Sequence, residues 1–442
     1  MLCSKITKHK AQNMNNNTSS KRPENQFYDD DEDDKTSSVV LIPGLPDHLA
    51  QQCLSAVPPS LLYGVCRSWR RFIYSPSFPP FYCLYALLSP SSSMASSSSS
   101  IAASTGKPEV LDLKYSIRIQ NKIYEKPNLI VRNSGKSEVP SSSIEFLCLD
   151  PLSSKWARLP SPPPEPPLKI LHRHPSFISR TLPVQSLAVS GKLLLVAGTT
   201  HNFVPALDRP LCFDPSSGEW FSGPPFTAPR RWCATGSVHG QVYVASGVGS
   251  GYQGDVARSL EKWDVSEKPA DWKWEKLTSL KNGQFCREAV EGVGYKGKLC
   301  MVNIKGNAVK EGAVYDVTAD RWEKMPRGML EGWNGPAAVA EETTAGDGDN
   351  EIYMVDEAIG SLSRYKPEDD SWEEVIQSSE HLKGAERIAV ERGKVCAVSG
   401  RGRWVTVVDV AAQPARIWVV NPPPEMEFIA VHILPRMKSV EN

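Results

Sequence analysis

A spacing recurs along the chain from residue 150 onward: an aspartate followed, six residues later, by a tryptophan. The step runs from Asp150 to Trp156, Asp214 to Trp220 and Asp316 to Trp322; it is kept from Lys366 to Trp372 and is longer from Asp264 to Trp274 and from Asp409 to Trp418. The six tryptophans lie about 52 residues apart on average, and sequence repeats of about 50 residues are typical of β-propeller blades. The repeat therefore predicts a ring of six similar units.

Short apolar segments, joined by turns that contain glycine, precede most of the tryptophans. The clearest examples are residues 186–198, 237–247, 292–303, 351–357 and 387–400. Their alternating pattern predicts the first two strands of each unit, followed by a third strand that ends at the aspartate and a fourth that contains the tryptophan. We therefore expect four antiparallel strands per blade. The regular position of the tryptophans favours packing between blades over an aromatic binding ring.

The two ends of the repeat region complement each other. Residues 81–88 resemble the second strand of a blade that has no first strand before it. Residues 428–434 resemble a first strand with no blade after it. We expect the C-terminal strand to complete the first blade, because closing the ring removes two exposed strand edges.

Three segments have the composition of tails, inserts or linkers. Residues 1–38 are polar and end in an acidic run at 29–34, residues 89–143 include a serine-rich insert within the first blade, and residues 160–167 are rich in proline. We expect the N-terminal tail to be disordered, because it has little apolar surface to bury.

Residues 41–76 differ from the repeat region and predict a small helical module. Pro46 and Asp47 are suited to a helix start, and the pair Pro58–Pro59 interrupts the helical pattern. Apolar residues at helical spacing lie on both sides of this break. About 40 residues bury too little apolar surface to form a robust core, so we expect the module to bind another surface.

The overall composition restricts the class of partner and the compartment. Lys and Arg total 50, as do Asp and Glu, which argues against a nucleic acid or an anionic membrane as the main partner. The N-terminus lacks the apolar core of a secretory signal, and the ten cysteines form no disulfide-like pattern. We expect an intracellular protein of the cytoplasm, the nucleus or both.

Chemical motifs give little support for catalysis. Residues 249–254 match GxGxxG, but the segment after them predicts another strand of a blade rather than the βαβ unit of a dinucleotide site. His172 and His174 have no further metal-ligating residue at a suitable spacing. We expect no catalytic residue, no metal and no cofactor, and a propeller enzyme is the least favoured alternative.

Residues 44–73 resemble an F-box, with Leu45-Pro46-Asp47 near the start and Val65-Cys66-Arg67-Ser68-Trp69-Arg70 near the end. With the degenerate kelch repeats that follow, residues 41–437 are similar to plant F-box/kelch-repeat proteins of the Skp-interacting-partner group. The resemblance implies a mostly β fold: a six-bladed kelch-type β-propeller at 81–437, preceded by a small all-α F-box at 41–76.

The resemblance also implies a function. It is that of a non-catalytic substrate-recognition subunit of a Skp–cullin–F-box ubiquitin ligase, which binds a Skp-family adaptor, through it a cullin, and a target protein. The alternative is a kelch propeller that acts as a protein-interaction scaffold outside any ligase.

Two sets of residues are candidates for these contacts. The adaptor set comprises Leu45, Pro46, Leu49, Leu54, Val57, Leu61, Leu62, Val65, Cys66 and Trp69. The target set comes from loops after second strands and between blades: His201, Arg231, Tyr252, Arg258, Arg287, Trp333, Arg401 and Arg403. Arg and Trp are enriched in binding hot spots, and arginines suit an acidic or phosphorylated target.

Overall fold

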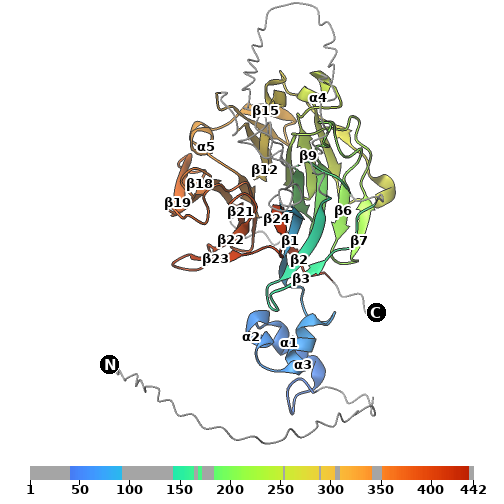
Figure 1. Ribbon diagram of the computed structural model, residues 1–442, viewed down its shortest axis with the longest axis vertical. Coiled ribbons are helices and arrows are strands. Elements are labelled where there is room, and N and C mark those ends of the chain that lie inside the picture. The colour runs from blue at the N-terminus through green and yellow to red at the C-terminus, as the bar shows by residue number, and fades with distance from the viewer. Residues whose placement is uncertain are drawn as a thin grey trace, which may run out of the picture.

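The structure, a computed structural model, describes residues 40–91, 143–163, 168–171, 184–251, 254–287, 290–303, 309–340 and 351–437. The predicted tail at 1–38, most of the serine-rich insert, part of the proline-rich segment, and His172 and His174 lie outside these residues. A ring of sheets makes up most of the described part, and a small helical module lies beside it (Figure 1).

Six four-stranded antiparallel sheets form the blades, here named A to F in chain order, which confirms the predicted six-bladed propeller. Blade A contains β24 (Met426–Pro435), β1 (Tyr82–Pro90), β2 (Glu145–Asp150) and β3 (Lys155–Arg158); blade B contains β4 (Gln185–Val189), β5 (Lys192–Ala197), β6 (Leu211–Asp214) and β7 (Glu219–Ser222); blade C contains β8 (Ala234–Val238), β9 (Gln241–Ala245), β10 (Leu260–Asp264) and β11 (Glu275–Lys276). Blade D contains β12 (Val290–Tyr295), β13 (Lys298–Asn303), β14 (Gly312–Asp316) and β15 (Arg321–Lys324); blade E contains β16 (Ala337–Val339), β17 (Ile352–Asp356), β18 (Ser361–Lys366) and β19 (Ser371–Ile376); blade F contains β20 (Arg387–Glu391), β21 (Lys394–Ser399), β22 (Trp404–Asp409) and β23 (Arg416–Val420).

The C-terminal strand closes the ring, as predicted. β24 is the innermost strand of blade A and pairs with β1 along its length, for example Leu84 with Ile433 and Ala86 with Val431. It also contacts the inner strands of blades F and B. The two ends of the propeller are therefore joined through one sheet. β1 continues to Pro90, two residues into the region expected to be the serine-rich insert.

The core of the propeller lies between adjacent blades. Each of the five interfaces from B–C to F–A has its own cluster of buried apolar side chains, and the A–B cluster continues into the helical module. Second strands such as β5 and β21 are buried over almost their whole length, because both faces pack against neighbouring blades.

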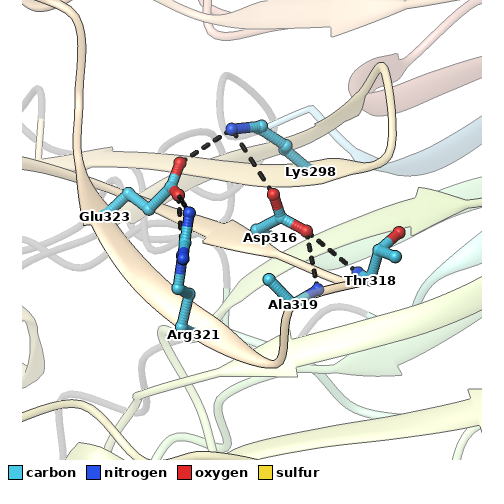
Figure 2. Close-up of polar contacts among 6 residues, drawn as sticks. All are labelled: Lys298, Asp316, Thr318, Ala319, Arg321 and Glu323. Carbon is cyan, nitrogen blue, oxygen red and sulfur yellow. Dashed lines mark hydrogen bonds and ion pairs between the residues drawn. The ribbon is translucent and has the colours of Figure 1, made fainter.

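The recurring aspartate stabilises the turn between the third and fourth strands. In blade D, Asp316 accepts hydrogen bonds from the backbone N–H groups of Thr318 at 3.0 Å and Ala319 at 2.9 Å (Figure 2). Its second oxygen lies 3.6 Å from the amine of Lys298, which begins the second strand. These backbone bonds, more than the lysine, hold the pKa of Asp316 below its usual value.

The same pairing recurs in other blades. Lys192 lies 3.5 Å from Asp214, Lys394 lies 2.9 Å from Asp409, and Gln241 donates to Asp264 at 3.0 Å. The recurring aspartate thus forms a side-chain contact between the second and third strands of these blades.

The recurring tryptophans join neighbouring blades, as expected. The indole N–H groups of Trp220, Trp274, Trp322 and Trp372 donate to backbone carbonyls of the preceding blade or of the connection after it, at 2.7–3.1 Å. Trp418 is the exception, because its side chain is 43% exposed. In blade F, Trp404 makes the corresponding bond, donating to the carbonyl of His381 at 3.0 Å. The prediction of blade packing is therefore wrong for Trp418.

The helical module contains α1 (Asp47–Ser55), α2 (Pro59–Tyr63) and α3 (Arg67–Tyr74). Pro46 is the N-cap of α1, and Pro58 precedes α2, which confirms the predicted helix start and break. Cys66 is the N-cap of α3, and its sulfur accepts a hydrogen bond from the backbone N–H of Trp69 at 3.4 Å.

Among the described residues, four short helical segments connect strands of the propeller: α4 (Gly254–Arg258), α5 (Arg327–Gly332), η2 (Pro269–Asp271) and η3 (Gln284–Arg287). The helix α4 begins at Gly254, the last glycine of the GxGxxG segment, a detail that the sequence did not predict. The strand after it, β10, is antiparallel to β9, so the segment is not a βαβ nucleotide site. No helix among the described residues is long and apolar enough to span a membrane.

Candidate interaction surfaces

The helical module lies beside one end of blade A (Figure 1), and its buried side chains belong to the same apolar cluster as residues of that blade. Leu54, Leu62, Phe72 and Ile73 are buried in one cluster with residues of β1, including Tyr85. The module therefore shares a core with the propeller, which explains how so short a segment can hold three helices.

The helical module and the residue just before it leave several apolar side chains exposed to solvent. Among the described residues, nine large apolar residues are at least 36% exposed, and four of them lie within 40–65. These four are Val40, Leu49, Leu61 and Val65, with exposed fractions of 54%, 39%, 65% and 58%. A group of exposed apolar residues on so small a module is typical of a protein-binding surface.

The predicted adaptor set divides between this exposed surface and the interior. Pro46, Leu49, Leu61, Val65 and Cys66 are exposed, and Leu45, Val57 and Trp69 are half-buried. Trp69 donates its indole N–H to the carbonyl of Leu41 at 2.7 Å, so it also stabilises the module itself. Leu54 and Leu62 are buried, because helical spacing places them on the faces that pack onto the core. Neither is available to a partner, so the prediction of adaptor contact is wrong for both.

The described members of the predicted target set lie at one end of the ring. β1 begins, and β2 and β24 end, beside the module. Because all six blades have the same topology, the loops after second strands and the connections into first strands lie at the other end, here called the distal end. The module and the predicted target loops are thus at opposite ends of the propeller.

Four members of the target set are exposed at the distal end: His201, Arg258, Arg401 and Arg403. Arg401 lies between Gly400 and Gly402, and all three residues have positive φ angles of 60–81°. Such a conformation is costly for a residue with a side chain, and backbone strain of this kind is concentrated at functional sites. Arg403 donates to the carbonyl of Gly400 at 2.8 Å, which holds the loop together.

For two members of the target set, the prediction of target contact is wrong. Trp333 is completely buried between blades D and E, where it donates to the carbonyl of Gly335 at 3.1 Å. Arg231 is 5% exposed, and its guanidinium lies 3.9 Å from the centre of the Trp232 ring. Both lie in connections that follow an outer strand, where the chain turns inward to begin the next blade. Neither side chain can form a surface contact.

Tyr252 and Arg287 are the last two members of the target set. Tyr252 lies outside the described residues, and Arg287 is described only as part of the backbone of η3.

Arg230, which precedes Arg231 in the sequence, is also buried. It forms an ion pair of 2.8 Å with Glu261, and both side chains are 1% exposed. Its guanidinium also donates to the carbonyl of Ser246 at 3.3 Å, as expected for an arginine that bonds within a blade.

A central channel of 160 Å³ between the six inner strands was not predicted from the sequence. Arg387 of β20 forms a 2.7 Å ion pair across it with Glu291 of β12. The Nε2 atom of His432 lies 2.9 Å from the hydroxyl of Ser186. Burial, with a smaller effect from the charge of Arg387, lowers the pKa of His432 to about 4. These groups come from four blades, so no local motif could have revealed them.

Comparison with known proteins supplies close relatives. The chain is 45% identical to the F-box/kelch-repeat protein SKIP25 of Arabidopsis thaliana over 405 residues, which cover 90% of each protein. The F-box/kelch-repeat proteins At1g22040 and At2g44130 of the same plant are each 25% identical; the matches cover 52% and 75% of this chain and 57% and 76% of theirs. No family model matches the chain. A solved structure titled "Structure of YjhT" aligns with 46% of this chain and 68% of its own at 12% identity, with a TM-score of 0.34 that is too low to support any conclusion.

Proposed function

Since the chain belongs to the F-box/kelch-repeat proteins, we propose that it is the substrate-recognition subunit of a Skp–cullin–F-box ubiquitin ligase. In this role the helical module binds a Skp-family adaptor, and through it a cullin, while the propeller binds the target protein. The subunit itself has no catalytic task, and its contribution is to hold the target near the ligase's catalytic subunits.

The exposed apolar residues of the module carry the proposal. Leu49, Leu61 and Val65 are in solvent, although the same three helices bury other apolar residues against the propeller. Helices that present apolar side chains commonly bind in an apolar groove of a partner. The distal end, with Arg258, Arg401 and Arg403 exposed, would bind an acidic or phosphorylated segment of the target.

The test compares adaptor capture by two matched double variants. Leu61→Ala with Val65→Ala removes two exposed apolar side chains from the module. Val309→Ala with Ile359→Ala removes two from the propeller, where the exposed fractions are 83% and 50%. We expect recovery of the Skp adaptor from plant extract to fall at least about tenfold with the first variant only, a loss of about 1.4 kcal/mol.

Equal adaptor recovery from wild type and the module variant, with unchanged thermal unfolding, would contradict the proposal. The chain would then be an interaction scaffold outside any ligase, the alternative that its sequence left open. Proximity labelling in cells with an inhibited proteasome would identify the target. The same experiment would test the proposed location in the cytoplasm, the nucleus or both.

A further inference from the structure

The junction between the helical module and the propeller is packed, not a free linker. Only residues 75–81 separate α3 from β1, and two of them, Phe78 and Phe81, are buried. The rings of Phe72 and Phe78 meet edge to face with centroids 5.3 Å apart. Two domains joined by a short packed segment move less than domains joined by an exposed one.

Blade A uses its recurring aspartate differently from the other blades. Asp150 still accepts hydrogen bonds within its own turn, from the backbone N–H of Leu152 at 2.7 Å and the hydroxyl of Ser153 at 2.9 Å. In blades B, C, D and F, a Lys or Gln at the start of the second strand also binds the aspartate. The strand register places Cys83 at that position in blade A.

The carboxylate of Asp150 binds the module instead. The hydroxyl of Tyr74, the last residue of α3, donates to its Oδ2 atom at 2.5 Å. Burial and then this hydrogen bond raise the pKa of Tyr74, so the hydroxyl stays protonated and remains a donor. A carboxylate that elsewhere joins strands of one blade here joins the propeller to the helices.

Arg436 completes the contact from the other end of the chain. It follows the closing strand β24 directly, and its backbone N–H donates to the carbonyl of Phe81 at 2.7 Å. Its guanidinium donates to the carbonyl of Tyr74 at 3.0 Å and lies 5.4 Å and 5.6 Å from the ring centres of Tyr74 and Phe81. One side chain thus contacts the end of α3, the start of β1 and the end of β24.

We propose that Arg436, with Tyr74 and Asp150, is a positioning residue that couples closure of the ring to the orientation of the helical module. The inference rests on the proposed function, because a fixed orientation determines where a target on the distal end lies relative to the adaptor. The contacts join residues from the N-terminal and the C-terminal parts of the propeller sequence. The orientation is therefore fixed only when β24 is in place.

The test measures the distance between module and propeller in the full-length chain. Spin labels are introduced as unnatural amino acids at Gln52 of α1 and Glu219 of β7, which are both exposed, because Cys53 and Cys66 are also exposed and would react with thiol labels. Pulsed electron resonance gives the distance distribution. Arg436→Ala should widen it at least about twofold, because the module then keeps its apolar packing but loses the polar contacts that fix its orientation. Arg416→Ala, at an exposed arginine of β23, should leave it unchanged.

An Arg436→Ala distribution as narrow as that of wild type would overturn the proposal. If that variant does not fold, Tyr74→Phe removes only the hydroxyl, and it should still widen the distribution. An unchanged width there would overturn the proposal equally. Adaptor capture distinguishes this inference from the proposed function: both variants should keep adaptor binding, whereas a wild-type chain that captures no adaptor would contradict the function alone.

Discussion

In the propeller, the apolar side chains of each blade lie against the next blade, whereas the helical module leaves several of its own in solvent. Five interfaces between blades have a separate buried cluster, and β24 removes the two edges that an open ring would expose. The module has no comparable enclosure. Its buried side chains belong to one cluster with blade A, whereas Leu49, Leu61 and Val65 are exposed.

The difference indicates which part of the chain buries its apolar side chains within its own core. Most of the recurring aspartates and tryptophans also bind partners within the ring, as Asp316 and Trp322 do, whereas Asp150 binds Tyr74 of the module and Trp418 is exposed. The structure thus divides the chain into a propeller with a closed core and a short segment, residues 40–65, that contains four of the nine large apolar side chains exposed among the described residues. Changes in the core of the propeller should lower stability, and changes at the exposed apolar residues of the module should lower adaptor binding.

Deleting residues 426–442 should have the largest effect, because it removes the inner strand of blade A and opens the ring. We expect insoluble protein or loss of cooperative unfolding, measured by solubility after expression and by thermal unfolding. Deleting only residues 438–442 leaves β24 intact and is the control. A soluble truncated chain that melts like wild type would show that the propeller does not depend on closure.

Arg230→Met should destabilise the propeller by about 3–5 kcal/mol, because Glu261 would remain as a buried charge without its partner. Both side chains are 1% exposed, so water cannot replace the lost contact. Denaturant unfolding measures the loss, and Arg327→Met, at a side chain that is 88% exposed, is the control. Adaptor capture should be unchanged at temperatures where the variant stays folded. A variant as stable as wild type would mean that the pair contributes nothing to blade C.

His432 should make the stability of the propeller depend on pH. Its pKa in the folded protein is about 4, below the value of about 6.5 expected when unfolded, so the unfolded chain binds the extra proton between these values. The contribution of His432 to the free energy of unfolding is therefore fully present above about pH 6.5. It is lost as the pH drops toward 4, which lowers the stability by about 3 kcal/mol. Urea unfolding at several pH values should show a shallower loss in His432→Asn than in wild type. His201→Asn, at an exposed histidine, should follow wild type; parallel curves for all three proteins would refute the assignment.

The fold could be predicted from the sequence because the repeated residues form the same bonds in successive blades. The aspartate caps a turn of a few residues, and the tryptophan reaches the blade just before it, so both leave a regular spacing. The closing strand was predictable for a similar reason, since a second strand at residues 81–88 lacked a neighbour.

The candidate site was less predictable because exposure depends on how loops turn between blades. Trp333 and Arg231 are of residue types that are enriched in binding hot spots, yet both side chains are buried. Leu54 and Leu62 could not be separated from Leu61 and Val65 by spacing alone, since the propeller surface decides which face is covered. The contact of Arg436 with Tyr74 joins residues 362 positions apart and leaves no local pattern.

The smallest effect is expected in blade E, where Lys366 takes the position of the recurring aspartate. Glu351, just before β17, lies 3.7 Å from Lys366 at the end of β18, and Glu373 lies 3.4 Å from the same lysine. In blade D the charges are reversed, with Lys298 before Asp316 (Figure 2). The pairing across the two strands is thus kept although its sign is inverted.

Exchanging the two charges in blade E should therefore be tolerated in part, because it keeps the pairing across the strands but removes the 3.1 Å ion pair of Arg364 with Glu351. Lys366→Asp alone places an acid beside Glu351 and Glu373, and we expect a loss of about 1 kcal/mol in urea unfolding. Adding Glu351→Lys should recover part of it, since Arg364 then loses its partner Glu351 but keeps Glu373, and the recovery should shrink at high salt because these side chains are partly exposed. The same exchange in blade D should be worse, because Asp316→Lys removes the acceptor for the N–H groups of Thr318 and Ala319. Equal losses in the two blades would mean that the ion pair, and not the turn, is the reason for the recurring aspartate.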